Sequence, residues 1–142
     1  MERVIEFSLN NPLLIGALLM VLAAIVANEV MNFRRSRNAI SATDATRLYN
    51  QDAAVFVDIR NENAYQSSHL PGAINIPMEH IDKHQDRLKR FSGRSVIVYC
   101  DTGQRTLKAV QALQAQGWQD VHQLRGGLNG WREASLPTEG RG

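Results

Sequence analysis

The stretch VIVYCDTGQRT, residues 96–106, joins a short apolar run to the start of a helical pattern. Its first four residues are β-branched or aromatic, which is typical of a buried strand. From Thr106 to Gly117 the apolar residues Leu107, Val110 and Leu113 recur at helical spacing. A strand that runs through a short loop into a helix is the repeating unit of an α/β fold.

Cys100, the only cysteine of the chain, ends this strand and opens the loop. Backbone amides of the loop, the positive end of the following helix and Arg105 would all face a sulfur at this point, and each favours a thiolate over a thiol. We therefore expect Cys100 to be a reactive nucleophile. The alternative is a buried cysteine that only fills the strand end, as free cysteines commonly do.

The chain beyond Asn38 repeats this alternation of short apolar runs and helical stretches. Because strands that alternate with helices form parallel sheets, the sequence predicts a parallel α/β sheet with ligands at the carboxyl ends of its strands. Strands are expected at 54–59, 73–76, 95–99 and 121–124, and helices at 62–68, 77–91, 106–117 and 128–134. A further short helix, capped by Ser41 or Thr43, is expected to run through Asn50.

Composition bounds the possible functions. With 142 residues, of which 44% are hydrophobic and 21% charged, the chain can form one compact domain and an appendage. The net charge is only +2, and the most basic stretch, 83–94, has acidic residues interleaved, so no nucleic-acid partner is expected. A single cysteine cannot form an internal disulfide, which suits a reducing compartment.

The appendage is an apolar segment near the N-terminus. Residues 12–27 contain no charged side chain and further apolar residues follow up to Phe33, a length that spans the hydrocarbon core of a bilayer. A basic juxtamembrane linker, 34–38, comes next, whereas the short segment 1–11 has no positive surplus. We therefore expect a single transmembrane helix, 12–33, in the inner (cytoplasmic) membrane, with the N-terminus outside and the domain in the cytoplasm. A cleaved signal peptide and a buried helix of the domain are the alternatives.

Four spaced motifs resemble those of the rhodanese-like domain, in its single-domain, membrane-anchored form. They are VDIR at 57–60, HLPGAINIP at 69–77, VIVYCDTGQRT at 96–106 and GGLNGW at 126–131. The resemblance covers residues 39–137 and leaves 138–142 as a tail that we expect to be disordered. It implies a five-stranded parallel sheet flanked by helices, which agrees with the alternating pattern.

The resemblance also implies sulfur transfer. In that family a cysteine thiolate takes sulfane sulfur from a donor, becomes a persulfide and passes the sulfur to cyanide or a thiol acceptor, without a cofactor. Cys100 would be the catalytic residue. Successive loop amides would cradle the anionic terminal sulfur, Gly103 would let the backbone curl, and Arg105 would pair with an anionic donor. The substrate-binding loop is then formed by Asp101, Thr102, Gly103, Gln104, Arg105 and Thr106.

Three further residues are assigned a structural role. Asp58 and Arg60 lie at the end of a neighbouring strand, and the resemblance implies that they brace the active-site loop or its surroundings. His69 precedes a Pro-Gly turn and is expected to bond the backbone rather than act as a base. His80 and His84 are spaced for one helix face but have no apparent third ligand, so no metal site is expected.

Asp101 departs from the usual family pattern, in which a basic or neutral residue often follows the cysteine. Its charge beside the sulfur disfavours a dianionic donor such as thiosulfate. Four residues separate Cys100 from Arg105, which matches the sulfurtransferase loop and is one residue shorter than in related dual-specificity phosphatases and arsenate reductases. The remaining alternative is a non-catalytic binding or scaffold module that serves a membrane-protein partner.

Overall fold

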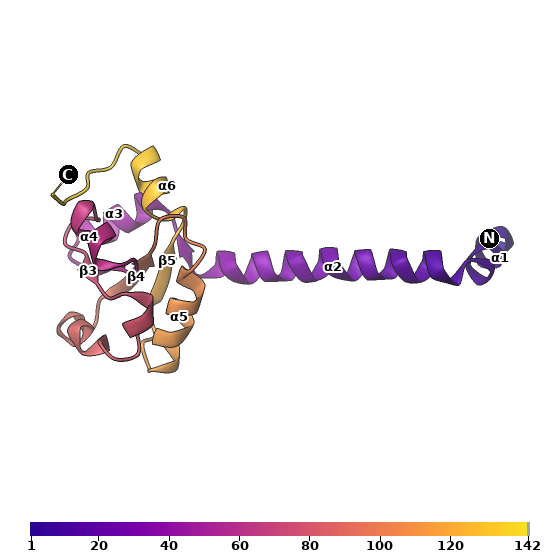
Figure 1. Ribbon diagram of the computed structural model, residues 1–142, viewed down its shortest axis with the longest axis horizontal. Helices are drawn as coiled ribbons and strands as arrows, with labels where there is room; N and C mark the ends of the chain where they lie inside the picture. Colours follow the sequence, from indigo (N-terminus) through magenta and orange to yellow (C-terminus); the bar gives the residue numbers. More distant parts are fainter. Residues whose placement is uncertain (142) are drawn as a thin grey trace. The chain divides into compact units, whose positions relative to one another are not determined.

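The computed structural model describes residues 1–141, except for the side chains of 34–37. The chain divides into two units, Met1–Arg37 and Asn38–Gly142. The first unit holds helices α1 (Glu2–Asn10) and α2 (Pro12–Arg37), shown in Figure 1. Pro12 occupies the first position of α2, where its fixed φ and missing N–H cost nothing.

Helix α2 contains the apolar segment predicted to span a membrane. The stretch Pro12–Phe33 has 22 residues and a mean hydropathy of 2.3, and none of its residues is buried. It is therefore long and apolar enough to cross a bilayer. The basic residues expected in a linker instead continue the helix to Arg37, because neither glycine nor proline interrupts the sequence there.

The second unit is built on a five-stranded parallel sheet, as expected. Its strands are β1 (Ala39–Ile40), β2 (Ala54–Asp58), β3 (Ile74–Asn75), β4 (Ser95–Tyr99) and β5 (Val121–Leu124), in the spatial order β1-β5-β4-β2-β3. Strand β4 is central, so the loop that starts at Cys100 leaves the middle of the sheet. The two-residue strand β1 is too short to show a sequence pattern and was not among the predicted strands.

Helices cover both faces of this sheet (Figure 1). They are α3 (Ala42–Asn50), α4 (Glu62–Ser67), α5 (Thr106–Ala115) and α6 (Gly127–Glu133). Alternate residues of β2 enter two separate cores: Val55 and Val57 pack with α5, whereas Phe56 packs with α3 and α6. Burial on both faces explains why β2 and β4 read as continuous apolar runs.

The helix predicted over 77–91 is wrong. This segment forms two 3₁₀ helices, Met78–His80 and Gln85–Phe91, separated where His84 adopts φ −112°. The anchoring apolar residues Met78 and Ile81, and then Leu88 and Phe91, are each spaced by three. That spacing matches the three residues per turn of a 3₁₀ helix, so two short turns place all four against the core.

The segment expected to be a disordered tail makes backbone contacts with the domain as far as residue 141; residue 142 lies outside the described residues. Glu139 pairs with His69 in an antiparallel bridge, in which each amide donates to the other's carbonyl at 2.8 Å. The segment lacks apolar residues, so its order comes from backbone pairing, which a hydropathy pattern does not reveal.

Candidate active site

The sulfur of Cys100 lies at the carboxyl end of β4, where the thiol was expected. The residue is only 6% exposed, and the amide of Gly103 donates a hydrogen bond to Sγ at 3.0 Å. Gly103 has φ +86°, a conformation that side chains rarely adopt, so glycine lets the loop turn its amide back toward the sulfur. An N–H aimed at sulfur favours negative charge on that atom.

The loop after Cys100 is fastened at its far end by Thr106, the first residue of α5. The buried Thr106 hydroxyl donates to the carbonyl of Gly103 at 2.6 Å and lies 3.0 Å from Oε1 of Gln123 on β5. Thr106 therefore holds the loop against the sheet. Thr106 was predicted to belong to the substrate-binding loop, and its contacts show that it supports this loop.

The start of α6 fastens the near end of the loop. The amides of Leu128 and Asn129 donate to the carbonyls of Cys100 and Asp101 at 2.9 and 3.0 Å. Gly127 has φ +57°, and a Cβ there would collide with the Cys100 carbonyl and come within 2.8 Å of the Asp101 carbonyl. The GGLNGW motif thus contributes to the site by letting α6 approach the cysteine peptide closely.

A hollow of about 440 Å³ opens in front of the cysteine, large enough for a small ligand. Cys100 shares its lining with Arg105, which is exposed and so available to an anion entering the hollow. The structure brings together all the predicted loop residues except Gly103 and Thr106 on this lining. The lining residues are Ile59, Arg60, Asn61, Ala64, Cys100, Asp101, Thr102, Gln104 and Arg105.

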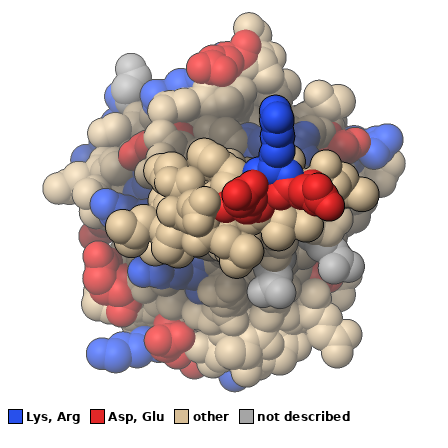
Figure 2. Space-filling view, turned by 90° about the vertical axis from the view of Figure 1, so that its right-hand side faces the viewer, with Lys and Arg blue, Asp and Glu red and all other residues tan. Residues whose placement is uncertain are grey.

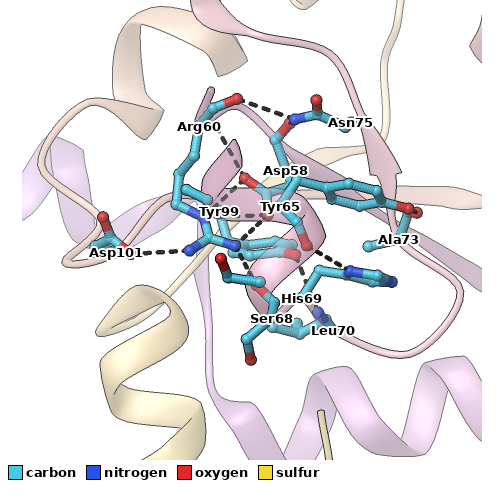
Figure 3. Close-up of polar contacts among 12 residues, drawn as sticks. Asp58, Arg60, Tyr65, Ser68, His69, Leu70, Ala73, Asn75, Tyr99 and Asp101 are labelled. Carbon is cyan, nitrogen blue, oxygen red and sulfur yellow. Dashed lines mark hydrogen bonds and ion pairs between the residues drawn. The ribbon is translucent and has the colours of Figure 1, made fainter. Parts of the chain in front are cut away.

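Arg60 joins the end of β2 to the loop (Figure 3). Its guanidinium binds both carboxylate oxygens of the fully buried Asp58, with Nη2 2.6 Å from Oδ2 and Nε 3.0 Å from Oδ1. Nη1 lies 3.1 Å from Oδ1 of Asp101, and Nη2 donates to the carbonyl of Ser68 at 2.5 Å. The bracing role predicted for Asp58 and Arg60 fits these contacts.

The guanidinium of Arg60 stays protonated in these surroundings. Burial lowers the pKa of the guanidinium, but the hydrogen bond and charge of Asp58 outweigh it, so the pKa lies above its usual value. Burial, followed by the charge of Asp58, likewise raises the pKa of the neighbouring Tyr99. Tyr99 is therefore neutral, and its hydroxyl accepts the Leu70 amide at 3.0 Å.

Asp101 does not present a free carboxylate to the hollow, because the carboxylate is paired with Arg60. The side chain is 62% exposed, so solvent weakens this ion pair. The sequence correctly placed a negative charge next to the cysteine. It could not show that an arginine 41 residues away partly neutralises that charge.

His69 bonds the backbone, as expected. Nδ1 lies 2.7 Å from the carbonyl of Tyr65, and the two rings stack with centroids 4.0 Å apart. The rings of His80 and His84 are 5.6 Å apart, and residues 1–141 contain no group of three or more His, Cys, Asp or Glu suited to a metal ion.

On the face shown in Figure 2, Lys and Arg side chains are interspersed with Asp and Glu side chains, so no concentrated basic patch is visible from this side.

Several residues that support the site were missed by the sequence analysis. Their contributions come from backbone groups, the amides of Leu128 and Asn129 and the carbonyl of Ser68, which any residue type can supply. A glycine pair before a helix was the available signal, since it marks a close approach of two backbones.

Comparison with known proteins agrees with this geometry. The family model of the rhodanese-like domain matches residues 41–134. The chain therefore belongs to the rhodanese-like domain family. It is 28% identical over 138 residues to the uncharacterised protein YibN of Escherichia coli (strain K12). The matched region covers 96% of each chain and so includes the apolar segment.

Two other similar proteins carry functional names. The tRNA uridine(34) hydroxylase of Buchnera aphidicola is 33% identical over 93 residues, which are 63% of this chain and 30% of that protein. The crystal structure of thiosulfate sulfurtransferase from Pseudomonas aeruginosa matches with a TM-score of 0.67 and 24% identity, over 72% of this chain and 19% of that one. This second likeness is one of fold.

Proposed function

We propose that the protein is a sulfurtransferase that carries sulfane sulfur as a persulfide on Cys100. The observation that carries the proposal is the hydrogen bond from the Gly103 amide to Sγ of Cys100, a residue that lines the same hollow as Arg105. A persulfide ends in an anionic sulfur. Like the Cys100 thiolate from which it forms, it is therefore stabilised by hydrogen-bond donors and positive charge around the sulfur.

The reaction consists of two displacements at sulfur. The Cys100 thiolate attacks the sulfane sulfur of the donor, a sulfur–sulfur bond forms, and the donor's remainder leaves with the electron pair of its broken bond. A thiolate or cyanide acceptor then attacks the terminal sulfur, and the Cys100 thiolate leaves. The cysteine ends as it began, so it acts as a covalent catalyst and no cofactor is required.

Mass spectrometry of the intact protein tests this proposal. After incubation with a sulfane-sulfur donor, the protein should gain the mass of one sulfur atom, and cyanide should remove it. The donors should include thiosulfate and a small-molecule persulfide, since Asp101 disfavours the first. An unchanged mass with every donor would contradict the proposal and favour a non-catalytic binding module.

Asp101→Asn is expected to raise kcat/KM for thiosulfate. The substitution removes a negative charge from the lining of the hollow and frees Arg60 to attract the dianion. Because the carboxylate is largely exposed, the gain should be only about twofold to fivefold, and added salt should reduce it. A persulfide donor with less charge should gain less. An equal gain for both donors would show that Asp101 acts through loop geometry.

We also propose that α2 anchors the protein in the inner membrane with the domain on the cytoplasmic side. The support is the apolar helix followed directly by basic residues. Protease added to inside-out vesicles should digest the domain, whereas right-side-out vesicles should protect it, and neither salt nor alkali should extract the protein. The reverse protection pattern would contradict the proposed orientation.

A further inference from the structure

Residues 138–141, which we call the strap, run along residues 66–72 of the domain. At one end the Glu139 carboxylate accepts the Gly72 amide at 3.2 Å and lies 3.6 Å from Nε2 of His69. At the other end the Arg141 amide donates to the Gln66 carbonyl at 2.9 Å. Together with the backbone bridge between His69 and Glu139, these contacts tie the strap to the segment that follows α4.

Gly140, at the centre of the strap, lies against the backbone of Ser67 and Ser68. Its φ is +144°, and a Cβ would come 2.5 Å from the Ser67 carbonyl oxygen and 2.9 Å from Cα of Ser68. Only glycine leaves room for this approach. The peptide that it covers leads directly to the Ser68 carbonyl, which is the acceptor for Nη2 of Arg60.

A continuous chain of contacts therefore leads from the strap to the cysteine loop. Gly140 and Glu139 fix the backbone around Ser68, whose carbonyl, together with Asp58, orients one arm of the Arg60 guanidinium. The other arm lies 3.1 Å from Asp101, the residue after the cysteine. Figure 3 shows the two arms of Arg60 directed at Ser68 and Asp101.

We propose that Gly140 and Glu139 are positioning residues for the sulfur-transfer site, an inference that rests on the proposed function. They keep Arg60 paired with Asp101 and so set the charge beside Cys100. When the strap detaches, the Ser68 carbonyl shifts, so Nη2 of Arg60 is left with Asp58 as its partner, and the contact of Nη1 with the Asp101 carboxylate weakens. The surroundings of the sulfur then become more negative and disfavour anionic reactants.

The test uses Cys100, the only thiol of the chain, as a probe of its own surroundings. The full-length protein in detergent is alkylated with neutral iodoacetamide and with anionic iodoacetate, and the ratio of the two rates is measured. Gly140→Ala should lower the iodoacetate-to-iodoacetamide ratio about twofold to fivefold, the range for a partly exposed ion pair. A general loosening of the fold would accelerate both reagents without lowering the ratio.

Two further variants sharpen this test. Gly93→Ala is the matched control, because Gly93 also has a positive φ, of +87°, but has open space where its Cβ would be. It should leave the ratio unchanged. In an Asp101→Asn background Gly140→Ala should have no effect on the ratio, because the carboxylate that it would release is absent.

Glu139→Ala should detach the strap less completely, and it replaces Gly140→Ala in the test if that variant does not fold. A normal ratio in a folded Gly140→Ala or Glu139→Ala variant would overturn the inference, and so would an equal fall in the Asp101→Asn background. Alkylation needs no sulfur donor. Failure of the wild-type protein to form a persulfide would therefore overturn the proposed function, whereas an unchanged alkylation ratio would overturn the positioning role.

Discussion

Cys100→Ser should reduce sulfur transfer to the background rate, and the variant should gain no sulfur from any donor. A serine hydroxyl is not ionised near neutral pH and does not form a stable bond to sulfane sulfur, so the first displacement has no nucleophile. The fold should survive, because the residue is small and its contact in the loop is one hydrogen bond from the Gly103 amide, which a hydroxyl can also accept.

The measurement pairs intact mass with a turnover assay. Transfer from a small-molecule persulfide to cyanide is followed for the wild-type and Cys100→Ser proteins, and tryptophan fluorescence checks the fold. Both tryptophans, Trp118 and Trp131, lie in the domain, so their emission reports on it alone. Full turnover by the serine variant would mean that the cysteine is a structural residue of the strand end.

The fold was predictable because its signals are local and repeated. Each central strand is an apolar run buried on both faces, as in Val96–Tyr99, and each main helix has either a cap or an apolar face. Ser41 illustrates the first kind of helix signal, since its side chain accepts the Asp44 amide at the start of α3. The segment 77–91 lacked such a signal, because spacing by three also occurs in α-helices.

The site was predictable only where sequence neighbours create it. Cys100 and Gly103 are three residues apart, so their contact follows from the loop itself. The pairing of Arg60 with Asp101 joins two strands, and the pairing of Glu139 with His69 spans 70 residues. Contacts of this kind depend on strand order and on backbone groups, neither of which a single sequence displays.

The buried ion pair below the loop gives the largest expected change in stability. Asp58→Asn should lower the free energy of unfolding by about 3–5 kcal/mol, because it leaves the guanidinium of Arg60, only 9% exposed, without its buried counter-charge. The substitution keeps the size of the side chain, so a change in packing volume does not contribute. Loss of Asp101 should cost at most about 1 kcal/mol, since that partner of the same arginine is exposed.

Urea unfolding of the full-length protein in detergent, followed by tryptophan fluorescence, compares the two variants directly. Asp58→Asn should shift the midpoint to a much lower urea concentration, and Asp101→Asn should leave it almost unchanged, although both remove one carboxylate from Arg60. The contrast follows from solvent, which screens the charge at Asp101 and is excluded from Asp58. Equal shifts would mean that burial does not set the strength of these two contacts.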